Sequence, residues 1–260
     1  MSISLSLDGK VALVSGGSRG IGAATVRMFT VAGARVVFSY RSARQQADAL
    51  VKECGPAVCH AVASDLKTPD AGRALVAAAA ARFGRLDILI ANHGVWPAED
   101  VPIEQMSDEQ WRSTLSINLD AVFGLVKHAV AQMKSQPRTK EPTGHIVLIS
   151  STSGQRGEAF HADYSSTKGA IISLTKSLSS ELARSGIYVN CVAPGWVDTD
   201  MSAGALQDPR IGDAIRSTIP LGRVGTPEEI AAPVLFLCTD HAGFISGEVF
   251  NVNGGAVLAG

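Results

Sequence analysis

The chain has 260 residues, 46% of them hydrophobic, and a formal net charge of −1 at pH 7. It is long enough to bury a large core, and the charge gives no field that would attract nucleic acid or an anionic membrane. The sequence contains no run of about 18 apolar residues, as a membrane span requires, and its N-terminus lacks the pattern of a signal peptide, so we expect a cytoplasmic protein with no membrane partner.

Short apolar segments alternate with longer segments of helical pattern along the chain. Strands are predicted at residues 10–17, 35–40, 57–65, 86–94, 144–151, 187–195 and 247–255. Helices are predicted at residues 21–34, 43–54 and 71–84. Two further helices are expected to begin at Ser107 and Thr226, because Gln110 and Glu229 follow three residues later, as in a capping box.

The predicted strands are continuous Val, Ile and Leu runs rather than alternating ones. Such strands are typical of a parallel sheet that is buried on both faces, and right-handed crossovers then give a doubly wound sheet. We therefore expect a seven-stranded Rossmann fold of the α/β class with helices on both faces. No Pro/Ser-rich linker or charge block divides the chain, which favours a single domain over residues 1–260.

The first predicted strand runs into a glycine-rich turn, SGGSRGIG, in which Gly16, Gly20 and Gly22 have the spacing GxxxGxG. Glycines here let the backbone approach a pyrophosphate, whose charge lies at the N-terminus of the next helix. The flanking strand and helix favour a dinucleotide site; the alternative is a tight turn without a ligand. No Lys-Ser/Thr pair follows, unlike in a nucleoside triphosphate loop.

Two arginines indicate which dinucleotide is bound. An NAD site usually has an acidic residue at the end of the second strand, but the segment there reads SYRSA, with Arg41 in the middle. Arg19 lies within the glycine turn. Two guanidinium groups favour a 2′-phosphate and so NADP(H), unless both are merely solvated surface side chains.

A tyrosine and a lysine four residues apart, Tyr164 and Lys168, follow the fifth predicted strand. On a helix they share one face, one turn apart. The strand itself ends in Ser150 and Ser151, at the carboxyl edge where open α/β sheets bind their ligands. The Tyr-Lys pair alone is weak support for catalysis, but its position after this edge strengthens it.

Together these segments resemble the short-chain dehydrogenase/reductase family nearly from end to end. The resemblance rests on SGGSRGIG, SDL, ANHG, SINLDAVF, VLISSTSG, YSSTK and NCVAPGWVDTDM, in this order. The segment IPLGRVGTPEEIAAPVLFLCTDHAGFISGEVFNVNGG is similar to the 3-oxoacyl-[acyl-carrier-protein] reductase subgroup. The resemblance implies hydride transfer between a nicotinamide cofactor and a carbonyl or secondary alcohol.

The resemblance also implies catalytic roles. Tyr164 would donate the proton to the carbonyl oxygen, and Lys168 would lower the pKa of the phenol and bind the nicotinamide ribose. Ser151, thirteen residues before Tyr164, would polarise the carbonyl, with Ser150 the weaker candidate. Asn118 would help to hold a water in a proton relay; its alternative is a helix-kinking residue without a catalytic role.

Further cofactor contacts are implied residue by residue. They are expected from Ser18, Arg19 and Ile21 in the glycine turn, Asp65 and Leu66 at the adenine, Asn92 and Gly94 after the fourth strand, and Pro194, Gly195, Val197 and Thr199 at the carboxamide. His93 replaces the commoner alanine between Asn92 and Gly94, and its role is open.

The substrate is less well indicated. The candidate contacts are Trp96, Ser153, Glu158, Phe160, His161, Trp196 and Met201. Glu158 and His161 suit a polar, hydroxylated substrate, whereas the aromatic residues suit an apolar one. Loop aromatics also often cover a core without binding a ligand.

The function expected from this pattern is an NADP(H)-dependent carbonyl reductase, with 3-oxoacyl reduction as the leading specific hypothesis. The alternatives are a sugar or polyol dehydrogenase and a non-catalytic NADP(H)-sensing protein. The resemblance implies a homotetramer, and the apolar segment after Phe250 is compatible with burial in one. The subgroup tends to have an arginine before Gly186, where this chain has Ser185, so docking of an acyl-carrier protein is doubtful.

The remaining reactive side chains suggest no second chemistry. The four cysteines, Cys54, Cys59, Cys191 and Cys238, contain no CxxC pair, and the six histidines have no HExxH spacing. We expect reduced cysteines and no metal site.

Overall fold

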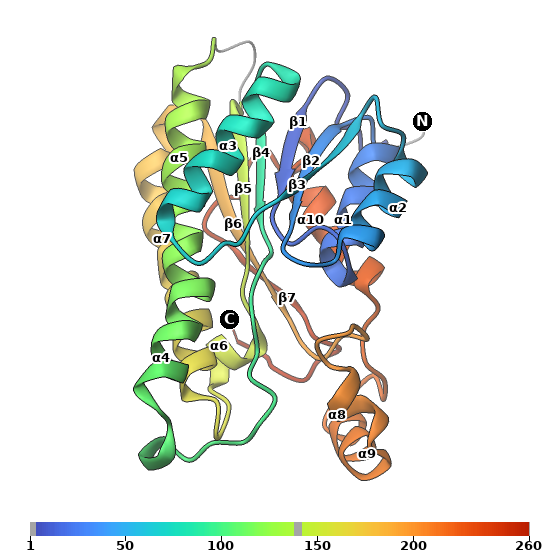
Figure 1. Ribbon diagram of the computed structural model, residues 1–260, viewed down its shortest axis with the longest axis vertical. Helices are drawn as coiled ribbons and strands as arrows, with labels where there is room; N and C mark the ends of the chain where they lie inside the picture. Colours follow the sequence, from blue (N-terminus) through green and yellow to red (C-terminus); the bar gives the residue numbers. More distant parts are fainter. Residues whose placement is uncertain (1–3, 138–141, 260) are drawn as a thin grey trace.

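Seven parallel strands form one sheet in the computed structural model, which describes residues 4–137 and 142–259. Their order is β3-β2-β1-β4-β5-β6-β7, as Figure 1 shows. The strands are β1 (Val11–Val14), β2 (Arg35–Tyr40), β3 (Cys59–Ala63), β4 (Ile88–Ala91), β5 (Gly144–Ile149), β6 (Ile187–Pro194) and β7 (Val249–Val252). The prediction of a seven-stranded Rossmann fold is confirmed.

Helices cover both faces of the sheet, and other, shorter helices lie outside these two layers. The helices are α1 (Gly20–Val31), α2 (Arg44–Cys54), α3 (Pro69–Phe83), α4 (Asp108–Leu115), α5 (Ala121–Ser135), α6 (Thr152–Arg156), α7 (Ala162–Leu182), α8 (Ala203–Gln207), α9 (Pro209–Ser217) and α10 (Pro227–Leu237). In Figure 1, α3, α5 and α7 cover the left face, and α1, α2 and α10 cover the right face.

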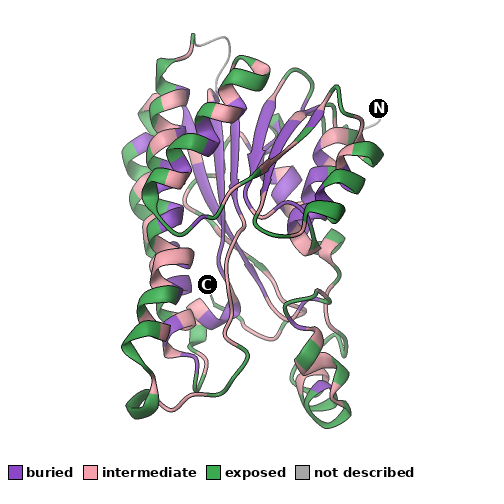
Figure 2. Ribbon diagram, viewed as in Figure 1, coloured by how far each residue is buried: buried purple, intermediate pink, exposed green. Residues whose placement is uncertain are grey.

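Alternating strand residues supply the two cores. Leu13 packs with the core under α3, α5 and α7, whereas its neighbours Ala12 and Val14 pack with the core under α1, α2 and α10. The central strands β1, β2, β4, β5 and β6 are therefore largely buried, as their purple colour in Figure 2 shows, whereas the edge strands β3 and β7 are partly exposed. This two-sided burial is the physical reason for their uninterrupted apolar sequence.

The connections reverse direction at β1. From β1 the chain first adds β2 and β3 on one side, and then β4 to β7 on the other. The carboxyl ends of β1 and β4 consequently border a crevice, the usual ligand site of such sheets.

Helix caps predicted from the sequence are present. The hydroxyl of Ser107 accepts a hydrogen bond from the Gln110 amide at the start of α4, and Thr226 and Glu229 form a complete capping box at α10. The long connection after β6 contains the short helices α8 and α9, which the sequence analysis did not predict. Among the described residues, no helix combines the length and hydropathy needed to cross a membrane.

Candidate active site

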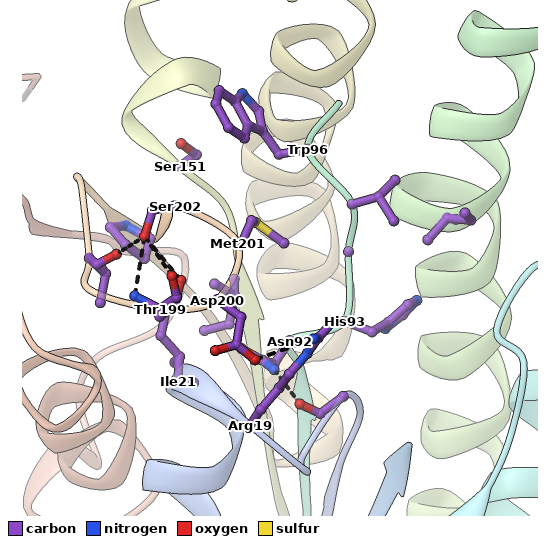
Figure 3. A pocket seen from close by; sticks show the side chains of 18 of the residues that line it. Arg19, Ile21, Asn92, His93, Trp96, Ser151, Thr199, Asp200, Met201 and Ser202 are labelled. Atoms are coloured by element: carbon purple, nitrogen blue, oxygen red, sulfur yellow. Dashed lines mark hydrogen bonds and ion pairs between the residues drawn. The ribbon is translucent and has the colours of Figure 1, made fainter. Parts of the chain in front are cut away.

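A cavity of about 320 Å³ lies at the carboxyl edge of the sheet. It collects most of the residues that the sequence predicted, from the glycine turn, the ends of β2, β4 and β5, α7 and the loop after β6. In Figure 3, Arg19, Ile21 and Asn92 lie at one end, and Ser151 and Trp96 lie at the other. Of the predicted residues, Gly22, Asn118, Phe160 and His161 do not line it.

The glycine turn forms a tight cradle at the N-terminus of α1. Gly16 and Gly20 have φ values of 65° and 52°, which favour glycine. A Cβ on Gly22 would lie 2.2 Å from the carbonyl oxygen of Gly16. The first turn of α1 has no acidic residue, so its amides and dipole are free to attract a phosphate. This cradle fits the pyrophosphate of a dinucleotide.

Asn92 fastens the cradle to the sheet. Its side-chain amide donates to the carbonyl oxygens of Ser15 and Gly16, both at 3.1 Å. The predicted contact residue therefore supports the phosphate loop as well as lining the cavity. Thr199 closes the cradle from the other side, because a Cβ on Gly20 would lie 3.2 Å from its methyl group.

The charged residues at this end favour a phosphate over a free ribose hydroxyl. Arg41 is exposed at the end of β2 and lines the cavity. Arg19 pairs with Asp200 at 3.3 Å, and both side chains remain more than half exposed. Asp65 lines the cavity and pairs with Lys67 at 3.1 Å, whereas Leu66 is buried.

The structure separates the two serines that end β5. The hydroxyl of Ser150 donates to the carbonyl oxygen of Lys168 at 2.7 Å and so joins β5 to α7. Ser151 is the N-cap of α6, accepts a hydrogen bond from the Ser153 amide, and hydrogen-bonds the Tyr164 side chain. Ser151 is thus the serine that contacts the phenol.

Lys168 is buried beneath Tyr164. Its ammonium lies 5.6 Å from the centroid of the Tyr164 ring and donates to the carbonyl oxygen of Ile149 at 2.9 Å. Burial lowers the pKa of Lys168 to about 8. The ammonium is therefore poised to lose its proton only slightly above neutral pH.

The pKa of Tyr164 is raised to about 12, opposite to the lowering expected from the sequence. Burial of the phenol is the largest cause; the hydrogen bond with Ser151 acts in the lowering direction, and the negative charge of Glu158 raises the pKa further. Lys168 is not among the groups that shift this pKa, and its ammonium donates to the carbonyl oxygen of Ile149.

Asn118 lies in a π-helical turn, Ser116–Asp120, between α4 and α5. Its side chain pairs with the backbone of Val95, accepting from the amide at 2.8 Å and donating to the carbonyl at 2.9 Å. A Cβ on Gly94 would lie 3.2 Å from Asn118 Oδ1 and 3.6 Å from Lys168 Nζ. Asn118 and Lys168 therefore meet around Gly94, although Asn118 does not line the cavity.

His93 packs against the phosphate loop. The Nδ1 atom of His93 lies 2.8 Å from the Ser15 hydroxyl, and a Cβ added to Gly16 would lie 3.2 Å from the Cβ of His93. Burial lowers the pKa of His93 to about 4, and the charge of Lys168 acts in the same direction. The imidazole is therefore neutral at physiological pH.

Aromatic residues dominate the opposite end of the cavity. The ring centroids of Trp96 and Trp196 lie 5.7 Å apart in an edge-to-face arrangement. Trp96 also contacts His161 at 5.0 Å, and His161 is buried and pairs with Asp100 at 3.2 Å. His161 therefore supports Trp96 from behind instead of lining the cavity as predicted.

The other substrate candidates divide in the same way. Ser153 and Glu158 line the cavity and hydrogen-bond each other, and Met201 lies at the exposed rim. Phe160 has a positive φ of 67° and is 51% exposed, outside the cavity lining. Its backbone carbonyl accepts a hydrogen bond from the Val101 amide.

Ser202 and Arg156 also line the cavity and were not predicted. The Ser202 hydroxyl accepts from the Thr199 amide at 3.1 Å and donates to the carbonyl of Val197, which closes the loop after β6 (Figure 3). A hydroxyl three residues after Thr199 is a recognisable local capping pattern, so this role could have been predicted. Arg156 carries no comparable signal.

Comparison with known proteins identifies the family. A family model described as enoyl-(acyl carrier protein) reductase matches residues 16–257. A 3-oxoacyl-[acyl-carrier-protein] reductase of Synechocystis is 37% identical over 97% of this chain and 98% of its own length. The chain belongs to the short-chain dehydrogenase/reductase family.

Solved structures agree with this assignment. A short-chain dehydrogenase/reductase, a glucose/ribitol dehydrogenase, of Brucella melitensis is 35% identical, with a TM-score of 0.89 over 99% of this chain and 100% of that one. A short-chain dehydrogenase of Burkholderia cenocepacia in complex with NADP is 33% identical, with a TM-score of 0.87 over 96% and 98% of the two chains. The prediction of an oxidoreductase of this family is confirmed.

Among the described residues, no group of three or more His, Cys, Asp or Glu side chains is placed to hold a metal ion. The four cysteines are free thiols, and Cys59, Cys191 and Cys238 are buried.

Proposed function

We propose that this enzyme is an NADP(H)-dependent carbonyl reductase whose substrates are 3-oxoacyl thioesters. One observation carries the proposal: a single cavity joins the phosphate cradle at Gly16–Gly22 to the Ser151, Tyr164 and Lys168 side chains. The similarity to 3-oxoacyl-[acyl-carrier-protein] reductases supports the substrate class.

The cofactor end binds the dinucleotide through backbone amides and cations. The glycine turn holds the pyrophosphate, Arg19 and Arg41 hold the 2′-phosphate, and Asp65 and Leu66 flank the adenine. Pro194, Gly195, Val197 and Thr199 hold the carboxamide, within a loop that Ser202 closes. Bound NADPH supplies the hydride.

The catalytic end supplies the proton. Tyr164 is protonated at neutral pH, because its pKa lies far above 7, and its hydroxyl donates the proton to the substrate oxygen. Ser151 donates a hydrogen bond to the same oxygen and orients the carbonyl. The Lys168 ammonium, next to the phenol, stabilises the phenolate that remains.

Proton return is assigned to the groups around Gly94. Lys168 Nζ and Asn118 Oδ1 both lie next to this glycine, and the side chain of Asn118 is fixed by Val95. Asn118 therefore positions the relay, and its π-helical turn is part of that arrangement. His93, which is neutral and bonded to Ser15, supports the phosphate loop and does not supply the proton.

A substrate screen tests this function. Oxidation of NADPH is followed with acetoacetyl N-acetylcysteamine, a simple ketone, a ketose and crotonyl N-acetylcysteamine. We expect the acetoacetyl thioester to give the largest kcat/KM and the crotonyl thioester, which has a C=C bond but no ketone, to give none. Faster reduction of the ketose would favour a sugar or polyol dehydrogenase, and binding of NADPH without any turnover would favour a sensor.

We also propose a homotetramer that works in the cytoplasm. The support is family resemblance together with exposed apolar side chains: Phe244 is fully exposed, Leu258 is 91% exposed, and Phe123 is 51% exposed. Light scattering on the purified protein tests the oligomeric state. Acyl-carrier-protein docking stays doubtful, because Ser185 precedes Gly186 where the subgroup tends to have an arginine.

A further inference from the structure

A carboxylate lies in the catalytic end of the cavity without a cationic partner. Glu158 is half-buried and lines the same cavity as Ser151 and Tyr164. The hydroxyl of Ser153, which is 8% exposed, donates to Glu158 Oε2 and holds the carboxylate in place. Within residues 4–137 and 142–259, no Lys, Arg or His side chain forms an ion pair with Glu158.

The charge of Glu158 reaches the reacting group. It acts to raise the pKa of Tyr164, so its field extends to the phenol that faces the substrate oxygen. Two cations line the same end: Lys168, which is buried and donates to Ile149, and Arg156, which is exposed at the rim. His161 and Asp100 neutralise each other when the imidazole is protonated.

We propose that Glu158, held by Ser153, selects neutral esters and thioesters of 3-oxo acids and rejects the free acids. This inference rests on the proposed carbonyl reduction. In a free 3-oxo acid the carboxylate carbon is two bonds from the reacting carbonyl carbon, so a free acid bound at Tyr164 brings its charge into the cavity that Glu158 also lines. A thioester linkage removes that charge and leaves the reacting ketone unchanged.

The expected size of the selection follows from like-charge repulsion. At a separation of about 6 Å and an effective dielectric of about 20, repulsion between two negative charges weakens binding of the charged ligand by roughly 100-fold relative to a neutral ligand. Solvent around a half-buried carboxylate screens this repulsion, so we expect a discrimination of about tenfold.

The test compares Glu158→Gln with the wild type. Glutamine keeps an acceptor for the Ser153 hydroxyl but removes the charge. At low ionic strength, kcat/KM is measured with NADPH for ethyl acetoacetate and for freshly prepared acetoacetate. We expect the ester-to-acid ratio of the wild type to fall about tenfold in Glu158→Gln, through faster reduction of acetoacetate. The matched control is Glu99→Gln, because Glu99 is exposed and does not line the cavity; its ratio should equal the wild-type ratio.

A second readout separates charge from structure. High salt should lower the ester-to-acid ratio of the wild type itself, a measurement that needs no variant.

The proposal would be overturned if Glu158→Gln folds, reduces the ester and keeps the ester-to-acid ratio of the wild type. It would also be overturned if salt does not change the ester-to-acid ratio of the wild type. If the wild type reduces neither acetoacetate nor its ethyl ester but reduces ethyl pyruvate, the 3-oxoacyl assignment fails. The role of Glu158 is then tested by the ratio of kcat/KM for ethyl pyruvate to kcat/KM for pyruvate. An enzyme that reduces no ketone ester overturns both.

Discussion

The two ends of the cavity are built from different materials. At the cofactor end, backbone atoms form most of the site. A Cβ on Gly22 would collide with the carbonyl oxygen of Gly16, and the side-chain amide of Asn92 donates to backbone oxygens. At the substrate end, side chains from two loops and from α6 line the cavity, among them Trp96, Trp196 and Ser153.

This difference explains which part of the function is easy to infer. A site made of backbone needs a particular residue spacing, because only glycine tolerates the required conformations and close approaches. A site made of side chains tolerates many combinations, because each loop can change one contact without disturbing the sheet. The cofactor follows from the first kind of site, and the substrate depends on the second.

The largest effect is expected when the proton donor at the catalytic end is removed. Tyr164→Phe should lower kcat by about 10³-fold, within the range typical of general acids, and leave the Kd for NADPH nearly unchanged. Steady-state kinetics and a fluorescence titration of NADPH measure the two quantities. Tyr188→Phe is the control, because Tyr188 lies on β6 against His145 and does not line the cavity. Retained turnover in Tyr164→Phe would remove the catalytic assignment.

The second-largest effect is expected from a substitution that disturbs the backbone cradle. Gly22→Ala places a methyl group 2.2 Å from the Gly16 carbonyl oxygen and 2.7 Å from the Asn92 amide nitrogen. Overpacking of this kind costs about 1–3 kcal/mol, so calorimetry should find NADPH binding weakened by roughly tenfold to 100-fold. Gly204→Ala is the matched control, since nothing lies within 4 Å of its added Cβ. Equal affinities in both variants would contradict the cradle.

A smaller change should redirect cofactor choice without damaging the cradle. Arg41→Asp replaces a charge-assisted hydrogen-bond donor with a carboxylate that repels a 2′-phosphate and accepts a ribose hydroxyl. The NADPH-to-NADH ratio of kcat/KM should fall by about 10- to 100-fold. Arg44→Asp changes the same charge three residues later, outside the cavity lining, and should keep the ratio. An unaltered preference in Arg41→Asp would count against the 2′-phosphate site.

The smallest expected effect concerns stability. The pKa of Lys168 is lowered to about 8 by burial, so between pH 8 and its ordinary value the unfolded chain binds more protons than the folded one, and wild-type stability rises with pH. Below about pH 8 the buried ammonium costs stability in full. Lys168→Met should therefore raise the melting temperature by a few degrees at neutral pH and by less at pH 10, while activity is lost.

Thermal melts at the two pH values measure this difference. Lys176→Met, an exposed position on the same helix, should change the melting temperature little at either pH. A gain for Lys168→Met that grows with pH would mean that the lysine is not strained by burial.

Local signals accounted for most of the fold and for one end of the site. The strands could be predicted because burial on both faces requires continuous apolar runs, and α4 and α10 because Ser107 and Thr226 carry cap signals in their own sequence. The short helices α8 and α9 were missed because they interrupt a loop without a long apolar period.

Other features depend on segments that meet only in the folded chain. Arg19 and Asp200 are 181 residues apart, and nothing near either one predicts their ion pair. The position of His161 behind Trp96 depends on the path of two loops, which is why it was expected in the cavity. The pKa of Tyr164 differs in direction from the expectation because burial raises it more than the hydrogen bond with Ser151 lowers it.

By itself the sequence determined the doubly wound sheet, the phosphate cradle and the tyrosine–lysine pair, because backbone conformation and helical or strand periodicity are written in neighbouring residues. Only the tertiary structure decided that Ser150 bonds the backbone of Lys168, where Asn118 is fixed and that burial raises the pKa of Tyr164. Those features arise from burial and from contacts between distant segments, and their energies depend on the surroundings that the fold creates.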